Sequence, residues 1–181
     1  MRVFNINGVL QKQLLDDHLD PTIKVAAEGG LQEGDTFLFN DPYDGGTHLN
    51  DFRLVRPIFR AGKLFCWVAS VGHWLDIGGN VPGGWGPKAT EIHQEGIVIP
   101  PVKLYEQGRL NEGLLAMFKA NVRLPNEIAG DMAAMVNVFT VGNRGIEALV
   151  KKYGRPVLKE CLNEMIAYSE RQMRSYISEL P

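Results

Sequence analysis

Glycine and proline are concentrated in one stretch of this 181-residue chain. The sequence contains 20 Gly and 10 Pro, and most of them fall between Gly29 and Pro101. Both residue types interrupt helices and favour turns. This part of the chain must therefore be built from short segments joined by turns, and a long helix within it is excluded.

The segments between these turns have the composition of β-strands. Residues 36–39 form a short apolar run, residues 52–59 mix apolar and basic side chains, and residues 64–70 are rich in aromatic and β-branched residues. The sequence RAGK at 60–63 predicts a tight hairpin turn between the last two segments. We therefore expect a strand-rich and loop-rich part over residues 30–110.

After residue 110 the pattern becomes that of helices. Asn111 can cap one helix, Pro125 can occupy the first turn of a second, and Pro156 can open a third after Gly154. The second helix carries apolar residues at helical spacing: Ile128, Met132, Met135, Val136 and Phe139. The fold class is therefore α+β, with a helical part over residues 111–181.

The third predicted helix carries an apolar stripe opposite charged side chains. Its members are Val157, Leu158, Cys161, Leu162, Met165, Ile166, Met173, Ile177 and Leu180. Such a stripe belongs to the core or faces a partner chain.

Charge and hydropathy exclude several function classes. With 19 Lys and Arg against 21 Asp and Glu, the net charge of −2 gives no field that would attract nucleic acid. The longest uncharged apolar stretch, residues 64–75, is too short to span a membrane, and the N-terminus lacks a signal peptide. Cys66 and Cys161 lie in apolar segments, which fits reduced, packed thiols. We therefore expect a cytoplasmic protein without nucleic-acid or membrane partners.

Two of the four histidines are followed three residues later by aspartate. These pairs are His48 with Asp51 and His73 with Asp76. Imidazole and carboxylate are ligands of divalent metal ions, and both pairs follow turns or strand-like segments, where a loop can direct two side chains at one ion. The pattern therefore predicts a metal site that includes both histidines.

The role of Asp76 has two interpretations. Its carboxylate can bind the ion directly, or it can accept the other ring proton of His73 and so fix the tautomer that binds metal. Neither His18 nor His93 is followed by an aspartate three residues later, and we interpret them as ordinary core or surface residues.

Glu91 and Glu95 flank His93. Carboxylates four residues apart can share a helical face, one acting as a base and the other orienting the substrate, or they can be two solvated acids. We retain both as candidate catalytic residues. The glycine-rich residues 78–86 fit no nucleotide-binding spacing, and we interpret them as a surface or lid loop.

Together these segments resemble the hydantoinase B/oxoprolinase family, the B-type subunit of N-methylhydantoinases, 5-oxoprolinases and related ketone carboxylases. The matching sequence is NDPYDGGTHLND at 40–51, VASVGHWLDIGG at 68–79, ATEIHQEG at 89–96 and IPPVKLYEQGRLNE at 99–112. The resemblance covers about residues 34–154. One departure is Trp74, where the family commonly has a second adjacent histidine.

The resemblance implies that His48, Asp51 and His73 are metal ligands, with zinc or manganese as the usual ion. Asp41 and Asp76 are then candidates for carboxylates that hydrogen-bond to these ligands without binding the ion themselves. His73, rather than Trp74, matches the expected ligand, so we expect the departure at position 74 to be tolerated.

The resemblance also implies a reaction and a partner. Family members work with an A-type subunit that binds ATP and Mg²⁺ and phosphorylates the substrate oxygen, while a metal-activated water in the B-type subunit attacks the carbonyl. This predicts a hetero-oligomeric, ATP-dependent cyclic amide hydrolase. The alternatives are the B subunit of a ketone carboxylase and a non-catalytic assembly module that docks through the third helix. Family B modules are several times longer, so we expect a fragment or the product of a split gene.

Overall fold

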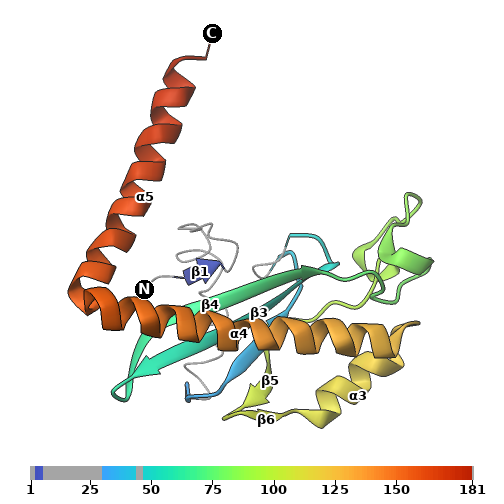
Figure 1. The fold of residues 1–181 in the computed structure, drawn as a ribbon. Coiled ribbons are helices and arrows are strands. Elements are labelled where there is room, and N and C mark those ends of the chain that lie inside the picture. Colours follow the sequence, from blue (N-terminus) through green and yellow to red (C-terminus); the bar gives the residue numbers. More distant parts are fainter. Residues whose placement is uncertain (1–2, 6–29, 44–46, 181) are drawn as a thin grey trace. The chain divides into compact units, whose positions relative to one another are not determined.

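The computed structural model describes residues 3–5, 30–43 and 47–180 (Figure 1). Its elements are β1 (Val3–Asn5), β2 (Thr36–Phe39), β3 (Asp51–Arg60), β4 (Lys63–His73), β5 (Val102–Glu106), β6 (Arg109–Leu110), α3 (Glu112–Ala120), α4 (Pro125–Tyr153) and α5 (Arg155–Ser178). Two single 3₁₀ turns, Pro82–Gly84 and Ile92–Gln94, lie between β4 and β5. The chain forms two compact units, Met1–Thr140 and Val141–Pro181.

The first unit is built on a six-stranded sheet with the order β1-β4-β3-β2-β5-β6. β1 runs parallel to β4, and the other pairs are antiparallel. The longest ladder joins β3 to β4, from Arg60 opposite Lys63 at the turn to Asp51 opposite His73 at the far end. The two turn residues have positive φ angles of 53° and 71°, as a tight hairpin requires. The predicted hairpin is confirmed.

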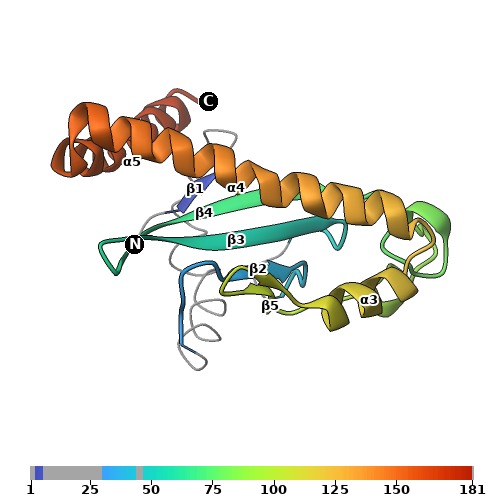
Figure 2. The same ribbon diagram turned by 60° about the horizontal axis from the view of Figure 1, so that its bottom comes forward.

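One face of this hairpin packs against α3 and the part of α4 up to residue 140 (Figure 2). The ring of Phe52 on β3 stacks on Trp74 with centroids 4.0 Å apart, and both rings meet Phe118 of α3 edge to face. On α4, Met135 Sδ accepts a hydrogen bond from Trp74 Nε1 at 3.2 Å. Of the apolar α4 residues expected at helical spacing, four are buried: Ile128, Met132, Met135 and Phe139.

The opposite face of the sheet has a second apolar cluster. It consists of Phe37, Phe39, Val55 and Trp67, with Leu31 and Ala69 packed against it. Because successive strand residues point to opposite faces, Asp51 and its partner His73 lie on this second face. The end of the β3–β4 ladder therefore carries Asp51 and His73 on this face and the packed rings of Phe52, Trp74 and Phe118 on the other.

The α+β class and the local helix signals are confirmed. Asn111 Oδ1 accepts from the backbone N–H of Leu114 at 3.0 Å and caps α3. α4 begins at Pro125, and α5 follows Gly154, as predicted. The sequence did not predict β5 and β6 as strands; they pair with each other, and β5 continues the sheet beside β2.

The two cysteines differ in environment. Cys66 is buried in β4, and this burial raises the pKa of its thiol to about 12. Cys161 is exposed, so the expectation of a packed thiol is wrong at that position. Cys161 belongs to the apolar stripe of α5, and this position did not ensure burial.

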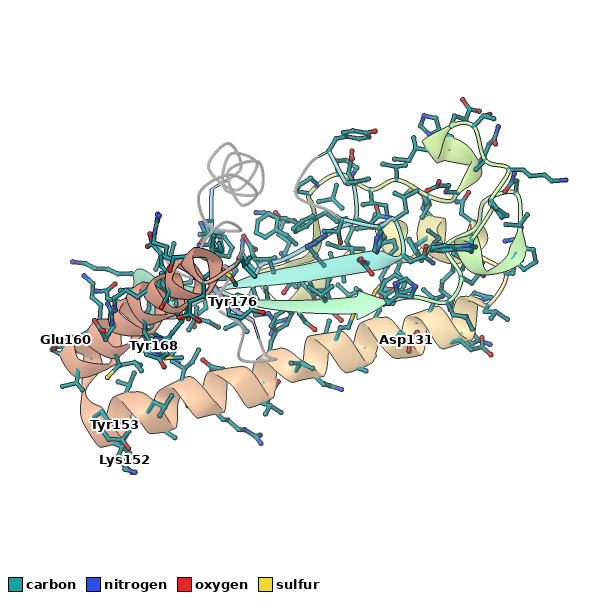
Figure 3. The ribbon with its side chains drawn as sticks, turned by 90° about the horizontal axis from the view of Figure 1, so that it is seen from above. Asp131, Lys152, Tyr153, Glu160, Tyr168 and Tyr176 are labelled. Carbon is teal, nitrogen blue, oxygen red and sulfur yellow. The ribbon has the colours of Figure 1, made fainter. Side chains whose placement is uncertain are left out.

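The second unit contains the end of α4 and the whole of α5. Leu158 and Leu162 are buried, but the rest of the stripe on α5 contains exposed apolar residues: Val157, Met165, Met173, Ile177 and Leu180. Tyr168 and Tyr176 are also exposed on this helix (Figure 3). None of the described helices combines the length and apolarity needed to cross a membrane.

Trp74→Ala should lower the free energy of unfolding by about 3–5 kcal/mol, because it leaves a cavity between Phe52 and Phe118. Trp85 provides a matched control, since its side chain is 82% exposed whereas that of Trp74 is 1% exposed. Urea unfolding followed by circular dichroism measures both variants. Equal destabilisation by Trp74→Ala and Trp85→Ala would contradict this account of the core.

Candidate functional site

The three residues predicted as metal ligands meet where the β3–β4 ladder ends. His73 is the last residue of β4 and lies opposite Asp51, the first residue of β3, while His48 precedes β3 in the adjoining loop. His73 Nδ1 is 2.7 Å from Asp51 Oδ1, and His48 Nδ1 is 2.9 Å from Asp51 Oδ2. One carboxylate therefore holds both imidazole rings.

Local hydrogen bonds fix the Asp51 carboxylate in turn. Thr47 Oγ1 donates to Asp51 Oδ2 at 2.8 Å, and the backbone N–H of His48 donates to the same oxygen at 3.3 Å. Partial burial opposes ionisation of Asp51, but hydrogen bonds from His73, Thr47 and the His48 backbone outweigh it and hold the pKa of Asp51 below its usual value. Asp51 is thus an anion that orients two rings.

Arg53 extends this network on the same face of β3. Its Nη2 donates to Thr47 Oγ1 at 3.2 Å, and its side chain is buried. Thr47 and Arg53 were not among the residues predicted from the sequence. The period of two along β3 was the available signal for Arg53, because it places this residue on the face of Asp51.

A cavity of about 470 Å³ opens beside the two imidazoles. Its polar lining residues are Thr47, His48, Asn50, His73 and Glu95. Its other lining residues are Pro42, Leu49, Gly84, Trp85, Gly86, Pro87 and Ala89. Segments that are distant in the sequence therefore converge on one space, and two of the glycines in the 78–86 loop form part of its wall.

Of the two candidate catalytic carboxylates, only Glu95 lines this cavity. The residues between Glu91 and Glu95 form a single 3₁₀ turn rather than a longer helix, so the expected shared helical face is not formed. His93 is exposed on this turn and does not line the cavity, while His18 lies outside the described residues.

Asn40 fixes two of the segments that form the cavity. Its amide donates to the carbonyl oxygens of Leu49 and Ile97, both at 2.8 Å, and accepts from the backbone N–H of Ile99 at 2.7 Å. Because Asn40 is fully buried, these bonds are shielded from water. The loop before β3 is thereby tied to the segment that follows Glu95.

Gly79 permits a second close approach. Its φ is +78°, and a Cβ atom at this position would lie 2.6 Å from the carbonyl oxygen of Glu95. Asn80 also donates its backbone N–H to the carbonyl of Gln94 at 2.8 Å. A residue with a side chain at position 79 would push the Glu95 segment away.

Asp76 is engaged elsewhere. Its buried carboxylate accepts from the backbone N–H groups of Gly78 at 3.2 Å, of Leu124 at 2.8 Å and of Arg123, and lies 3.5 Å from Arg123 Nη1. Burial opposes its ionisation, but these hydrogen bonds and the Arg123 charge hold the pKa of Asp76 below its usual value. Asp51, not Asp76, orients the His73 ring, which corrects the sequence-based interpretation.

Asp41 shapes the turn that precedes the ligand loop. Its Oδ1 accepts from the backbone N–H of Tyr43 at 2.9 Å, which is the pattern of an Asx turn. In the part of the chain that the structure describes, no hydrogen bond joins Asp41 to His48, Asp51 or His73. Support of the ligands by Asp41 stays a prediction.

The donor atoms of His48, Asp51 and His73 suit a divalent ion in type and nearly in spacing. Among residues 30–43 and 47–180, no three His, Cys, Asp or Glu side chains form a ready-made metal cage, and here the donors are hydrogen-bonded to one another. Zinc bonds of about 2.0–2.2 Å place neighbouring donors of a tetrahedral ion about 3.3 Å apart. The observed separations are 2.7 and 2.9 Å, so each imidazole nitrogen would have to move about 0.5 Å away from the carboxylate for the three residues to bind one ion.

Comparison with known proteins gives matches along most of the chain. The sequence model of the hydantoinase B/oxoprolinase family matches residues 11–181. The caprolactamase subunit beta of Pseudomonas jessenii is 35% identical over 179 residues, which cover 96% of this chain and 31% of that protein. The acetophenone carboxylase delta subunit of Aromatoleum aromaticum is 30% identical over 152 residues, which cover 83% of this chain and 22% of that protein.

The fold is also similar to a solved structure. The crystal structure of the ATP-dependent caprolactamase from Pseudomonas jessenii matches with a TM-score of 0.78 and 36% identity, over 91% of this chain and 29% of that chain. This match supports the mixed fold of a sheet and C-terminal helices. The present chain spans less than a third of the length of each of these proteins.

Asp76→Ala should lower the free energy of unfolding at pH 7 by about 2 kcal/mol, because several buried donors lose a charged acceptor. Asp131→Ala, at an exposed position of α4 (Figure 3), should change it by less than about 0.5 kcal/mol. Urea unfolding measures both variants.

The effect of Asp76→Ala should depend on pH. Because the folded protein holds the pKa of Asp76 below the unfolded value of about 3.9, the stability that its ionised form contributes is full above that pH and is lost as the pH falls through the folded pKa. The difference between wild type and variant should therefore shrink below about pH 4. A difference that stays constant from pH 7 to pH 3 would contradict this assignment.

Proposed function

Since the chain belongs to the hydantoinase B/oxoprolinase family, we propose that it carries the metal-binding part of the B subunit of an ATP-dependent cyclic amide hydrolase. The observation that carries this proposal is the Asp51 carboxylate held between His48 and His73 at the wall of a cavity. The similarity to a caprolactamase subunit over almost the whole chain supports it, because caprolactam is a cyclic amide.

In this proposal His48, Asp51 and His73 hold a zinc or manganese ion. When bound, the ion supplies Lewis acidity and a source of hydroxide at neutral pH. The chain's own residues set the geometry: Asp51 fixes both rings through their Nδ1 atoms, and Thr47 fixes Asp51. To bind an ion with these same atoms, the two Nδ1 atoms and the Asp51 oxygens would exchange their mutual hydrogen bonds for bonds to the ion, and Thr47 would keep the carboxylate in place.

Glu95 is the better placed of the two candidate catalytic carboxylates. It lines the same cavity as the histidines, whereas Glu91 does not. A carboxylate in that position can accept a proton from an attacking water or orient the amide N–H of the substrate. We therefore assign the acid–base role to Glu95 and retain Glu91 only as a neighbour.

The proposal includes an A-type partner subunit that binds ATP and Mg²⁺. The relatives are described as a subunit beta and a delta subunit, which supports a hetero-oligomer. Within this chain the glycine-rich segment has no nucleotide-binding spacing, and Gly84 and Gly86 line the cavity instead. Phosphorylation of the amide oxygen by the partner would supply the leaving group that a poorly electrophilic amide lacks.

A ketone carboxylase is the second candidate, and the similarity to the acetophenone carboxylase delta subunit favours it. The complete B subunit, incubated with its A-type partner and ATP, separates the two reactions. Ring opening of hydantoin or caprolactam supports the hydrolase, whereas incorporation of labelled bicarbonate into a ketone supports the carboxylase.

A non-catalytic assembly module is the third candidate, because apolar residues of α5 are exposed. If the chain is such a module, it should form a complex with an A-type subunit, and this complex should survive replacement of both His48 and His73. Loss of activity without loss of this complex would instead support a catalytic site.

The purified chain should contain about one zinc or manganese ion, and His48→Ala or His73→Ala should remove it, because each replacement deletes one of three ligands. His93→Ala is the matched control, since His93 is exposed and outside the cavity. Elemental analysis by mass spectrometry after dialysis measures the metal content. Full retention of the ion in the His48→Ala/His73→Ala double variant would reject the proposed site.

A further inference from the structure

α5 carries more apolar surface than its own packing uses. Leu158 and Leu162 are buried and Ile166 is half-buried, and these three form the inner row of the helix. Every described residue from 168 to 180 is exposed. Because helices in proteins draw most of their stability from packing of an apolar face, this exposed part of α5 is suited to packing against another surface.

A second row of side chains lies beside the inner row on the same helix. The members of this outer row are Val157, Cys161, Met165, Tyr168, Gln172 and Tyr176. At 3.6 residues per turn they fall within an arc of about 100°, which is the width of one helix-packing face. All of them are exposed, and apart from Gln172 they are apolar, aromatic or a thiol.

The outer row has the same spacing when it is counted from either end. Its successive members are 4, 4, 3, 4 and 4 residues apart. If two copies of α5 run antiparallel about a twofold axis between residues 166 and 167, each member therefore lies at the height of a member of the other copy. The facing pairs are Met165 with Tyr168, Val157 with Tyr176, and Cys161 with Gln172. Since a methionine packs favourably against an aromatic ring, the centre of the row is complementary to itself.

Charges beside the outer row are complementary in the same register. Glu164 and Arg171 lie just outside one edge of the row, and within one copy they form an ion pair. In the antiparallel arrangement Glu164 of one copy and Arg171 of the other lie on the same side of the interface, with a difference in height of about 3 Å. The twofold axis makes two such pairs. A parallel arrangement would place these side chains on opposite sides of the interface.

We propose that α5 pairs antiparallel with α5 of a second copy of this chain, through the outer row and the ion pairs between Glu164 and Arg171. This self-association is independent of the metal site in the proposed function. The full 181-residue chain should therefore sediment with twice the mass of one chain at micromolar concentration. A chain that stays monomeric up to its solubility limit, including one whose α5 binds a different protein, would overturn the proposal.

Met165→Asp should raise the dissociation constant of the dimer at least about a hundredfold, because the twofold axis buries two carboxylates in an apolar contact. Met173→Asp is the matched control: Met173 is 60% exposed and Met165 is 51% exposed, but Met173 lies outside the outer row. Circular dichroism checks that both variants keep their helices. Equal weakening of the dimer by the two substitutions would contradict the proposed interface.

Charge reversal tests the ion pairs. Glu164→Arg and Arg171→Glu should each weaken the homodimer about tenfold, because two exposed attractions become repulsions. A mixture of the two variants should form a heterodimer as tight as the wild-type dimer, since each Arg then faces a Glu. Glu170→Arg, on the opposite side of α5, should leave the dimer unchanged. A mixture that remains as weak as the separate variants would rule out this register.

Disulfide formation tests the direction of pairing. In Gln172→Cys the new thiol should bond to Cys161 of the other copy, and the two thiols lose two protons and two electrons to diamide as oxidant. Glu170→Cys, on the opposite side of the helix, should not cross-link. In the wild-type dimer the two Cys161 thiols lie about 16 Å apart along the axis, which is beyond the reach of a disulfide. Rapid cross-linking of the wild-type chain through Cys161 would indicate a parallel pair and overturn the proposal.

Discussion

The register of the β3–β4 hairpin determines where the candidate functional side chains lie. The tight turn fixes which residues pair at one end of the ladder, and the same register places Asp51 opposite His73 at the other end. A slip of one residue would exchange the two faces of a strand, so that His73 would point toward the helices. The stacking of Phe52 on Trp74 against Phe118 opposes such a slip. An apolar cluster on one face thereby stabilises a polar site on the other.

On the polar face, one carboxylate organises the site. Asp51 holds two imidazoles, and Arg53 reaches it through Thr47. Arg53 is buried, and its Nε and Nη1 have no hydrogen-bond partner among the described residues. Burial lowers the pKa of Arg53, and the nearby charge of Asp51, which favours the charged form, offsets only part of this effect. Hydrogen bonds therefore connect the buried Arg53 side chain to the Thr47 hydroxyl and on to the Asp51 carboxylate. This carboxylate in turn contacts the two imidazole rings beside the cavity.

The sequence predicted those features that depend on near neighbours. Asn111, Pro125 and Gly154 mark helix ends through local geometry, and the structure confirms each of them. The spacing of His48 and Asp51 likewise indicated that the two side chains act together, and they are in contact.

Features that depend on distant contacts were not predictable in the same way. The carboxylate of Asp76 is engaged by Arg123, which lies 47 residues later, and no local pattern distinguishes this from a role beside His73. Glu91 and Glu95 look equivalent in sequence, but a single 3₁₀ turn places only Glu95 at the cavity. The strands β5 and β6 were missed because they are short and of mixed polarity, and pairing with β2 rather than composition makes β5 a strand.

We propose that His48, Asp51 and His73 share one metal ion, and X-ray absorption spectroscopy of the zinc-loaded chain identifies the ligands of that ion. We expect a first coordination sphere of nitrogen and oxygen at about 2.0–2.2 Å with the multiple-scattering signature of two imidazoles. Replacement of either His48 or His73 should remove one imidazole from this signature. A spectrum without imidazole, or with sulfur at about 2.3 Å, would contradict the claim.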